Sequence, residues 1–357
     1  MPEYLLIWFL SLCPTSNICY SVLMFRVLGL LCVIWFIIFT IRVVSLGGID
    51  PTYKDPEVNL FLEFRENLTQ ILDQSLPYPQ NALLSGILLG TQSNLPINFK
   101  NDLKTTSTIH MVVVSGQNLS MLAGFVMSMV IFLGRKKTVF LTIFVIVFYS
   151  LLTGLGVPVL RAAIMALFAY LAQILGKDKS GWWVLFLTAG LMLIYNPNWL
   201  LNISFQLSFL ATFGVVVVAP ILMETLKKIP EILKQDLSTT ISAQALVLPI
   251  IAFNFNQISL AGVFANILIL WTIPLVMVSG IITLILGSIS PILGQIVGLF
   301  PGILLTYFID IVSVFAKMPG ASLNIEKTTT IMWVGYYLII GALIMILYRN
   351  DKTTTGR

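Results

Sequence analysis

Polar side chains recur inside long apolar stretches of this 357-residue sequence, and these residues could do chemistry in a hydrophobic setting. One apolar stretch contains His110, followed by Ser115, Gly116 and Asn118. Hydrogen-bond donors and a guanidinium at such depth are typical of a hydrophilic path through a helical bundle. The other candidates for lining this path are Arg161, Gln206, Ser208, Gln244, Asn266 and Asp310.

Catalytic and metal-binding patterns are poorly represented. The chain has one histidine, and its three cysteines lie near the N-terminus without metal-ligand spacing. A Ser115–His110 dyad is disfavoured because the two residues differ by about 140° on an ideal helix. Neither a zinc-protease motif nor a phosphate-binding loop occurs. We therefore expect no catalytic residue, no metal site and no cofactor.

Two interpretations compete for each buried polar residue. Serine, asparagine and glutamine commonly hold membrane helices together, and this structural role is the more probable one for any single Ser or Asn. Ionisable side chains cost at least ~2.5 kcal/mol each at the centre of a membrane helix, so they usually face protein or water. For Arg161, His110 and Asp310 we therefore favour a functional role.

Composition indicates the elements that must position these residues. Hydrophobic residues make up 58% of the chain and charged residues 10%, and the mean hydropathy is +0.96. Continuous apolar runs long enough to cross a bilayer predict an all-α, polytopic helical bundle of about ten spans. We place the spans near 22–45, 107–133, 138–153, 157–175, 182–195, 201–222, 238–253, 258–286, 291–315 and 329–348. Pro274 and Pro301 suggest that the two longest, 258–286 and 291–315, are broken helices.

The predicted domain organisation is simple. Residues 1–46 form an N-terminal membrane anchor, 47–105 a short outer-face segment, 106–348 the main transmembrane domain, and 349–357 a tail. Within the outer-face segment, helical spacing of apolar residues over 57–76 predicts an amphipathic helix on the membrane surface. The apolar piece 81–90 is too short to span, which predicts an interfacial or re-entrant helix.

Basic residues predict the orientation. If 107–133 runs from outside to inside, most lysines and arginines fall on cytoplasmic connections, and the short outer connections near 154–156, 196–200 and 254–257 carry none. We therefore expect a multi-pass protein of the cytoplasmic membrane with both termini in the cytoplasm. The residues on the predicted inner side are Arg26, Arg135, Lys136, Lys137, Lys177, Lys179, Lys227, Lys228, Lys234, Arg349, Lys352 and Arg357.

Four short patterns, in order along the chain, resemble the ComEC family of competence proteins. Residues 110–119 read HMVVVSGQNL, which is similar to the family's H-L-x-x-x-S-G-x-H-V signature. Residues 153–165 place Thr-Gly ahead of PVLRAAIM, which is similar to a glycine followed by P-x-x-R-A-x-x-M. Residues 196–211 hold Asn-Pro and then SFQLSFLA, the most specific match, to P-x-x-L and F-Q-L-S-F-x-A. The fourth pattern, over 244–266, carries Gln244, Pro249, Phe253 and Ala265-Asn266.

The resemblance covers roughly 80–345 and implies the channel domain that passes single-stranded DNA across the cytoplasmic membrane. It also implies that Arg161 receives phosphates while Ser115, Asn118, Gln206 and Ser208 donate hydrogen bonds along the path. Implied partners are single-stranded DNA, the lipid bilayer, a separate DNA receptor, nuclease or helicase, and further copies of the chain.

Two departures from the family pattern affect this expectation. Asn118 stands where the family has its second histidine, which puts chemistry that needs both histidines in question. Residues 47–105 are too short for the outer OB-like domain, and no H-x-H-x-D-H motif follows the spans. We therefore expect no metallo-β-lactamase-like nuclease module, and no enzyme activity, in this sequence.

Two rival functions stay open at this stage. Proline-interrupted helices with Asp310 at depth fit an ion-coupled secondary transporter of a small solute, although no internal repeat is visible. A membrane scaffold without transport activity is the other alternative. Binding of single-stranded DNA separates the channel from both.

Overall fold

The structure is a computed structural model that describes residues 17–50, 53, 60–91, 95–112, 114–174, 181–226, 230–255, 257–259, 261–324 and 330–355. The chain is almost entirely helical, and the predicted all-α membrane bundle is confirmed. Two compact units divide it: Met1–Tyr53 with Gly190–Leu201, and Lys54–Ala189 with Asn202–Arg357.

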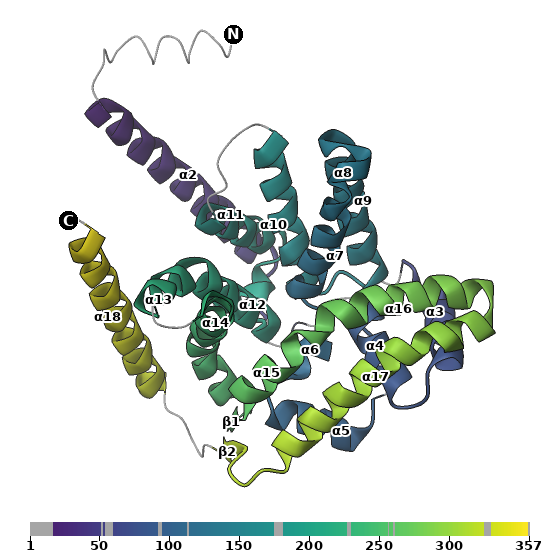
Figure 1. Cartoon of the computed structure of the whole chain (residues 1–357). Coiled ribbons are helices and arrows are strands. Elements are labelled where there is room, and N and C mark those ends of the chain that lie inside the picture. The colour runs from purple at the N-terminus through teal and green to yellow at the C-terminus, as the bar shows by residue number, and fades with distance from the viewer. Residues whose placement is uncertain are drawn as a thin grey trace. The chain divides into compact units, whose positions relative to one another are not determined.

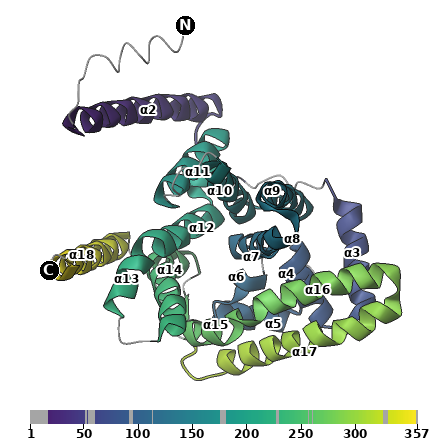
Figure 2. The ribbon, with the colours of Figure 1, turned by 45° about the horizontal axis from the view of Figure 1, so that its top comes forward.

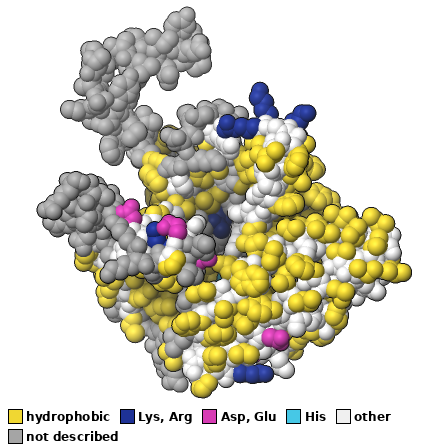
Figure 3. Space-filling view, in the orientation of Figure 1, with side chains coloured by type: hydrophobic (Ala, Val, Ile, Leu, Met, Phe, Trp, Pro, Cys, Tyr) yellow, Lys and Arg dark blue, Asp and Glu magenta, His cyan; other side chains and the backbone are white. Residues whose placement is uncertain are grey.

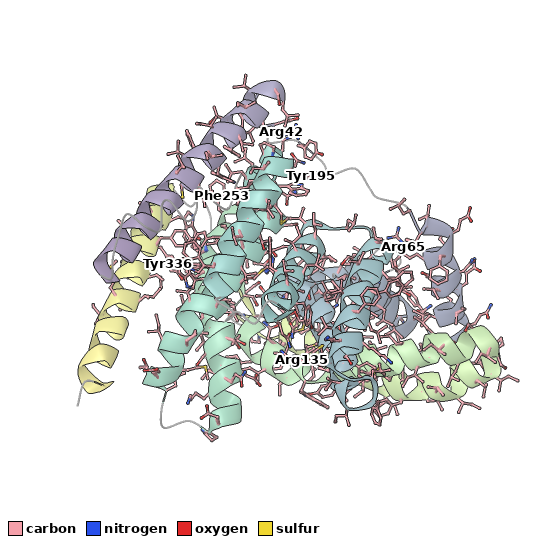
Figure 4. All side chains as sticks on the ribbon, turned by 90° about the horizontal axis from the view of Figure 1, so that it is seen from above. Arg42, Arg65, Arg135, Tyr195, Phe253 and Tyr336 are labelled. Carbon is pink, nitrogen blue, oxygen red and sulfur yellow. The ribbon has the colours of Figure 1, made fainter. Side chains whose placement is uncertain are left out.

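The smaller unit joins helix α2 (Asn17–Ser45) to the end of α11 (Gly181–Tyr195) and the 3-10 turn η1 (Pro197–Leu201). The Trp35 indole donates to the Gly190 carbonyl at 3.0 Å. Arg42 donates to the carbonyls of Ile194 at 3.2 Å and Tyr195 at 2.9 Å, and Figure 4 labels Arg42 and Tyr195. These carbonyls lie at the C-terminal end of α11 and have no intrahelical donor. The Arg42 guanidinium donates hydrogen bonds to them and places a positive charge at the negative end of the helix dipole.

The larger unit is built on the hairpin of α16 (Thr272–Ile289) and α17 (Pro291–Ala316), which lie side by side in Figures 1 and 2. Glycines let the two helices approach: a Cβ built on Gly294 would lie 2.9 Å from the Gly287 Cα. Helix α3 (Leu62–Ser75) packs on this hairpin, and its Ser75 Oγ would lie 2.5 Å from the same Cβ. Small residues at such contacts are typical of membrane helices.

The outward side of this hairpin is strongly apolar. Figure 3 shows hydrophobic side chains covering much of the face over α16 and α17 and a small group of basic side chains over the end of α9. Exposed apolar residues recur on α17 at helical spacing, as expected for a helix that faces lipid. They are Ile292, Ile296, Leu299, Phe300 and Ile303.

Helix α4 (Gln80–Leu89) lies in the core rather than at a surface. Every residue from Ala82 to Leu89 is buried, and a Cβ on Gly280 of α16 would lie 2.8 Å from Leu88. The expectation of an interfacial helix is therefore wrong, because an interfacial helix keeps one face in water. The sequence gives α4 no polar face, and α3, α16 and α17 cover it. Its depth in a membrane, and hence the re-entrant alternative, stays a prediction.

The predicted span 107–133 is three helices. These are α6 (Ile109–Val112), α7 (Gly116–Ser128) and α8 (Val130–Leu133). The break before Gly116 is the one that a glycine in the middle of this apolar run suggests from sequence, whereas the break at Met129 was not expected. Ser115 is in an extended conformation and caps α7, with its Oγ accepting from the Asn118 amide at 3.4 Å. A capping serine directly before a glycine starts a new helix here, so His110 and Asn118 do not share one helical arc.

Of the two helix breaks expected at prolines, the structure has one just before Pro274 and none at Pro301. Pro301 lies inside the unbroken α17, so the expected break is absent there. Helix α15 (Gly262–Leu270) ends before Trp271, and α16 starts at Thr272. Pro274 has no N–H to donate to the Leu270 carbonyl, which accounts for an interruption just before it.

The remaining helices agree with the predicted spans to within a few residues at most of their ends. The span expected from 258 starts later, because Gln257–Ser259 (β1) pairs antiparallel with Ser322–Asn324 (β2). Four helical stretches in the described residues are long and apolar enough to cross a membrane, so the number of about ten spans stays a prediction. The four are Ile203–Thr225, Lys234–Asn254, Phe264–Ile289 and Pro291–Ala316. The other elements are α5 (Ile97–Thr105), α9 (Arg135–Leu152), α10 (Val157–Ile174), α12 (Ile203–Phe213), the π-turn η2 (Gly214–Val218), α13 (Ala219–Thr225), α14 (Glu231–Phe255) and α18 (Thr330–Thr355).

Helix α18 repairs a backbone defect in α14. Pro249 cannot donate to the Ala245 carbonyl, and the Tyr336 hydroxyl donates to that carbonyl at 2.8 Å. The adjacent Tyr337 hydroxyl donates to the Leu246 carbonyl at 2.9 Å. Figure 4 labels Tyr336 beside the helices that it contacts. Tyr336 thus joins α18 to α14 at the turn where Pro249 leaves a carbonyl without a helical donor.

Tyr336→Phe is expected to lower the free energy of unfolding by about 1–2 kcal/mol, because it leaves the Ala245 carbonyl without a donor. Tyr337→Phe is the matched control. Its acceptor, the Leu246 carbonyl, stands four residues before Ile250, which has an N–H, so a smaller loss is expected. Thermal unfolding of the detergent-purified variants measures both. Equal melting temperatures for the two variants would contradict the proposed repair.

Candidate functional site

Arg161 is the centre of the site. It lies on α10, only 8% exposed, with its guanidinium turned toward α12. Nε donates to Ser208 Oγ at 2.5 Å, and Nη1 donates to Thr212 Oγ1. The Phe209 ring lies 5.8 Å from the guanidinium carbon, which adds a cation–π contact. Helices α10 and α12 therefore hold a cation inside the protein by neutral groups.

The sequence of α12 explains this arrangement. Asn202 caps the helix, and its Oδ1 accepts from the Ser204 and Phe205 amides at 2.8 and 3.3 Å. Ser208 and Thr212 are four residues apart, so both hydroxyls lie on one helix face toward Arg161. Thr212 was not among the residues expected from sequence. Its spacing from Ser208 was the available signal, but that signal acquires meaning only once Arg161 is known to lie opposite.

Arg161 has no acidic partner among the residues that the structure describes. The ion pair that the described residues contain joins Lys234 and Glu231 of α14 at 3.0 Å and does not involve Arg161. A buried charge without a counter-charge costs several kcal/mol, which hydroxyl contacts offset in part. An ionisable side chain inside a membrane helix marks a candidate functional site. The electrostatics of the site therefore favour a negatively charged ligand.

Helix α7 forms the third wall. A Cβ built on Gly116 would lie 2.9 Å from Arg161 Nη2 and 3.0 Å from the Ala162 Cβ. Glycine is thus the residue that lets the start of α7 lie against the guanidinium. Behind this contact, Val114, Leu119 and Val159 pack in a small apolar cluster shared by α7, α9 and α10. The structure brings Gly116, Arg161 and Ser208 together, while the hydrophilic path itself stays a prediction.

Ser115 and Asn118 serve the architecture of this wall. Asn118 is 2% exposed, its Nδ2 donates to the Ile87 carbonyl at 3.1 Å, and its Oδ1 accepts from Ser115 Oγ at 3.2 Å. Ile87 is in the last turn of α4, where carbonyls lack intrahelical donors. Asn118 therefore caps the end of α4 from the start of α7, and both ends of its amide are engaged inside the protein.

Asn118→Asp is expected to reduce the free energy of unfolding by about 2–3 kcal/mol, since a carboxylate oxygen would face the Ile87 carbonyl oxygen. Ser120→Ala on the same helix is the control, because Ser120 is exposed and donates only to the Gly116 carbonyl of its own helix. Chemical or thermal unfolding in detergent measures the difference. A loss no greater than that of the control would show that the cap carries little stability.

The remaining predicted residues lie elsewhere in the described structure. His110 is exposed, and its Nδ1 is 2.8 Å from the Ser107 carbonyl oxygen. Asp310 is exposed on α17, while Asn266 on α15 is buried with no partner for its Oδ1 among the described residues. Gln206 and Gln244 are half-buried on α12 and α14. No described hydrogen bond joins these five residues to Arg161.

A model of a known family matches residues 87–350, and its description is "Competence protein". The chain belongs to the competence protein family. The match begins in α4 and includes α7, α10 and α12, so the whole Arg161 site lies inside the family domain. The family resemblance drawn from the four sequence patterns is confirmed.

Two curated relatives are similar to this chain and much longer than it. It is 24% identical to ComE operon protein 3 of Bacillus subtilis (strain 168) over 300 residues, which cover 83% of this chain and 38% of the relative. It is 28% identical to the uncharacterized protein YcaI of Escherichia coli (strain K12) over 236 residues, which cover 62% of this chain and 30% of the relative. The chain thus spans less than two-fifths of either relative. No solved structure matches it.

Proposed function

We propose that this chain is a membrane channel for DNA uptake that passes single-stranded DNA into the cytoplasm. The observation that carries the proposal is Arg161, a buried cation held by Ser208 and Thr212 with no described carboxylate partner, inside a competence protein domain. The similarity to ComE operon protein 3 of Bacillus subtilis is consistent with the same proposal.

The chemistry of the site suits a polyanion in transit. A single strand carries one negative charge per nucleotide, so a conduit needs cationic or donor-rich walls that bind weakly enough to release. A guanidinium presents planar donors that match phosphate oxygens. Because its other partners are neutral hydroxyls, Arg161 keeps its full charge for a passing phosphate.

The proposed location and partners of the protein are those expected from its sequence. The protein lies in the cytoplasmic membrane with both termini inside, it is not itself a nuclease, and it works with a separate DNA receptor, nuclease or helicase. The bundle also has exposed apolar faces on which further copies of the chain could pack, which makes a homo-oligomer part of the proposal.

Reconstitution tests the function directly. The purified full chain is inserted into lipid vesicles, and entry of a fluorescent single-stranded oligonucleotide is measured as fluorescence protected from added nuclease. Double-stranded oligonucleotide and protein-free vesicles are the controls. Protected single strand above both controls supports the channel. Exclusion of DNA from vesicles that pass a small solute would replace it with a solute transporter, and exclusion of both would favour a scaffold.

A further inference from the structure

The start of α7 leaves two backbone donors beside Arg161. Ser115 is the N-cap, its Oγ accepts from the Asn118 amide, and its carbonyl accepts from the Leu119 amide. The amides of Gly116 and Gln117 make no hydrogen bond to any described residue. The first N–H groups of a helix have no intrahelical acceptor, and they form the positive end of the helix dipole.

The guanidinium of Arg161 has one nitrogen to spare at the same place. Nε and Nη1 are engaged by Ser208 and Thr212, whereas Nη2 has no acceptor among the described residues. Nη2 lies 2.9 Å from the position of a Cβ on Gly116, so the unpartnered nitrogen is aimed at the beginning of α7. The residue as a whole is 8% exposed, so the guanidinium lies within the protein beside the start of α7.

Two positive groups therefore face each other without a described negative group between them. The helix N-terminus carries about half a positive charge, and the guanidinium carries a full one. Their juxtaposition is unfavourable unless an anion lies between them, and helix N-termini with a nearby basic side chain are common phosphate sites. The hydroxyls of Ser208 and Thr212 cannot supply this charge.

We infer that a phosphate-type oxyanion binds at this point, accepting hydrogen bonds from Arg161 Nη2 and from the Gly116 and Gln117 amides. The inference rests on the proposed function only for the source of the oxyanion, which in the channel is the phosphodiester of the passing strand. Free phosphate and the headgroup of an anionic lipid offer the same chemistry.

Gly116 gives the sharpest test because its missing side chain keeps the site open. A methyl group there would press on Nη2 at 2.9 Å and on Ala162 at 3.0 Å. Gly124 is the matched control: it is exposed on the same helix, and a Cβ there would meet nothing within 4 Å. Both variants replace a helical glycine by alanine, and only Gly116→Ala places a methyl group against the site.

The experiment measures the melting temperature of the detergent-purified full chain against inorganic phosphate, with ionic strength held constant by chloride. A ligand that binds the folded state raises the melting temperature with its concentration. We expect a phosphate-dependent rise for wild type and Gly124→Ala, and an apparent affinity at least about tenfold weaker for Gly116→Ala, as for a lost charge-assisted hydrogen bond. Equal phosphate responses of Gly116→Ala and Gly124→Ala would overturn the site.

A second variant covers the case in which Gly116→Ala fails to fold. Arg161→Lys keeps the charge but replaces the planar fork by one ammonium group, and it is also expected to lose about tenfold in apparent phosphate affinity. Undiminished phosphate binding by Arg161→Lys would overturn the assignment to Nη2.

Two further measurements identify the source of the oxyanion and separate this inference from the proposed channel. Competition by a short oligothymidylate at low phosphate identifies the strand, and competition by phosphatidylglycerol micelles identifies a lipid headgroup. Phosphate binding without DNA entry into vesicles would sink the channel and leave the site. Equal DNA entry by wild type and Gly116→Ala, with no phosphate response, would sink the site and leave the channel.

Discussion

Arg161→Gln is expected to lower DNA uptake by at least about 100-fold. It removes the buried positive charge and both N–H groups of Nη2, the nitrogen that Ser208 and Thr212 leave free for a phosphate. Charge-assisted hydrogen bonds are worth about 1.5–3 kcal/mol each, so the loss of two corresponds to at least about 100-fold. Uptake is measured as transformation frequency in a competent host that depends on this chain, with its membrane level checked by immunoblot.

The stability of the same variant provides an internal control. Replacing a buried cation that lacks a described counter-charge by a neutral amide does not leave an unpaired charge behind, so the melting temperature is expected to stay the same or rise. Lost uptake with an unchanged or raised melting temperature separates function from folding. Uptake within about threefold of wild type, at normal membrane level, would contradict a transport role for Arg161.

Gly214→Leu is expected to prevent stable folding, with a loss of at least about 3 kcal/mol. Gly214 starts the π-turn between α12 and α13, and a Cβ there would lie 2.5 Å from the Ser242 carbonyl oxygen and 3.1 Å from the Ala243 Cα. These are backbone atoms of α14, which cannot rotate away as a side chain does. The contact therefore fixes how closely the end of α12 and α14 pack, two residues after Thr212.

The folded yield in detergent and the melting temperature measure this effect, with Gly124→Leu as the control because its site is open. Gly124→Leu is expected to behave like wild type. A Gly214→Leu protein that melts with the control would show that α12 and α14 separate at little cost, and that the π-turn does not hold the face of α12 that carries Ser208 and Thr212.

Much of the helical architecture follows from the sequence. Apolar runs such as 138–153, 157–175 and 291–315 appear as α9, α10 and α17 within a few residues of the predicted ends. A helix satisfies its own backbone locally, so hydropathy and length suffice to predict it. Ionisable residues inside such runs also stand out from sequence, because their cost in lipid is high wherever they lie. Arg161 was found in this way.

The errors share one origin, which is contact between segments distant in sequence. A helix as short as α4 is predicted at an interface when it is considered alone, yet α3, α16 and α17 enclose it. The run 107–133 looks continuous in hydropathy, yet the capping of α7 by Ser115 and the tie from Asn118 to Ile87 divide it. A serine cap has almost no hydropathy signal, so in the sequence only the glycine marks this break.

By itself the sequence determined that this is an all-α membrane protein with a cation near the start of an apolar helix, and its motifs indicated the competence protein family. Those conclusions depend on local quantities, namely the hydrophobicity and length of each segment and the order of short motifs. Only the tertiary structure decided that Ser208 and Thr212 hold the guanidinium and that Gly116 brings the start of α7 against its last free nitrogen. Such contacts depend on how three helices pack, and side-chain packing across a bundle is not encoded in the periodicity of any one helix.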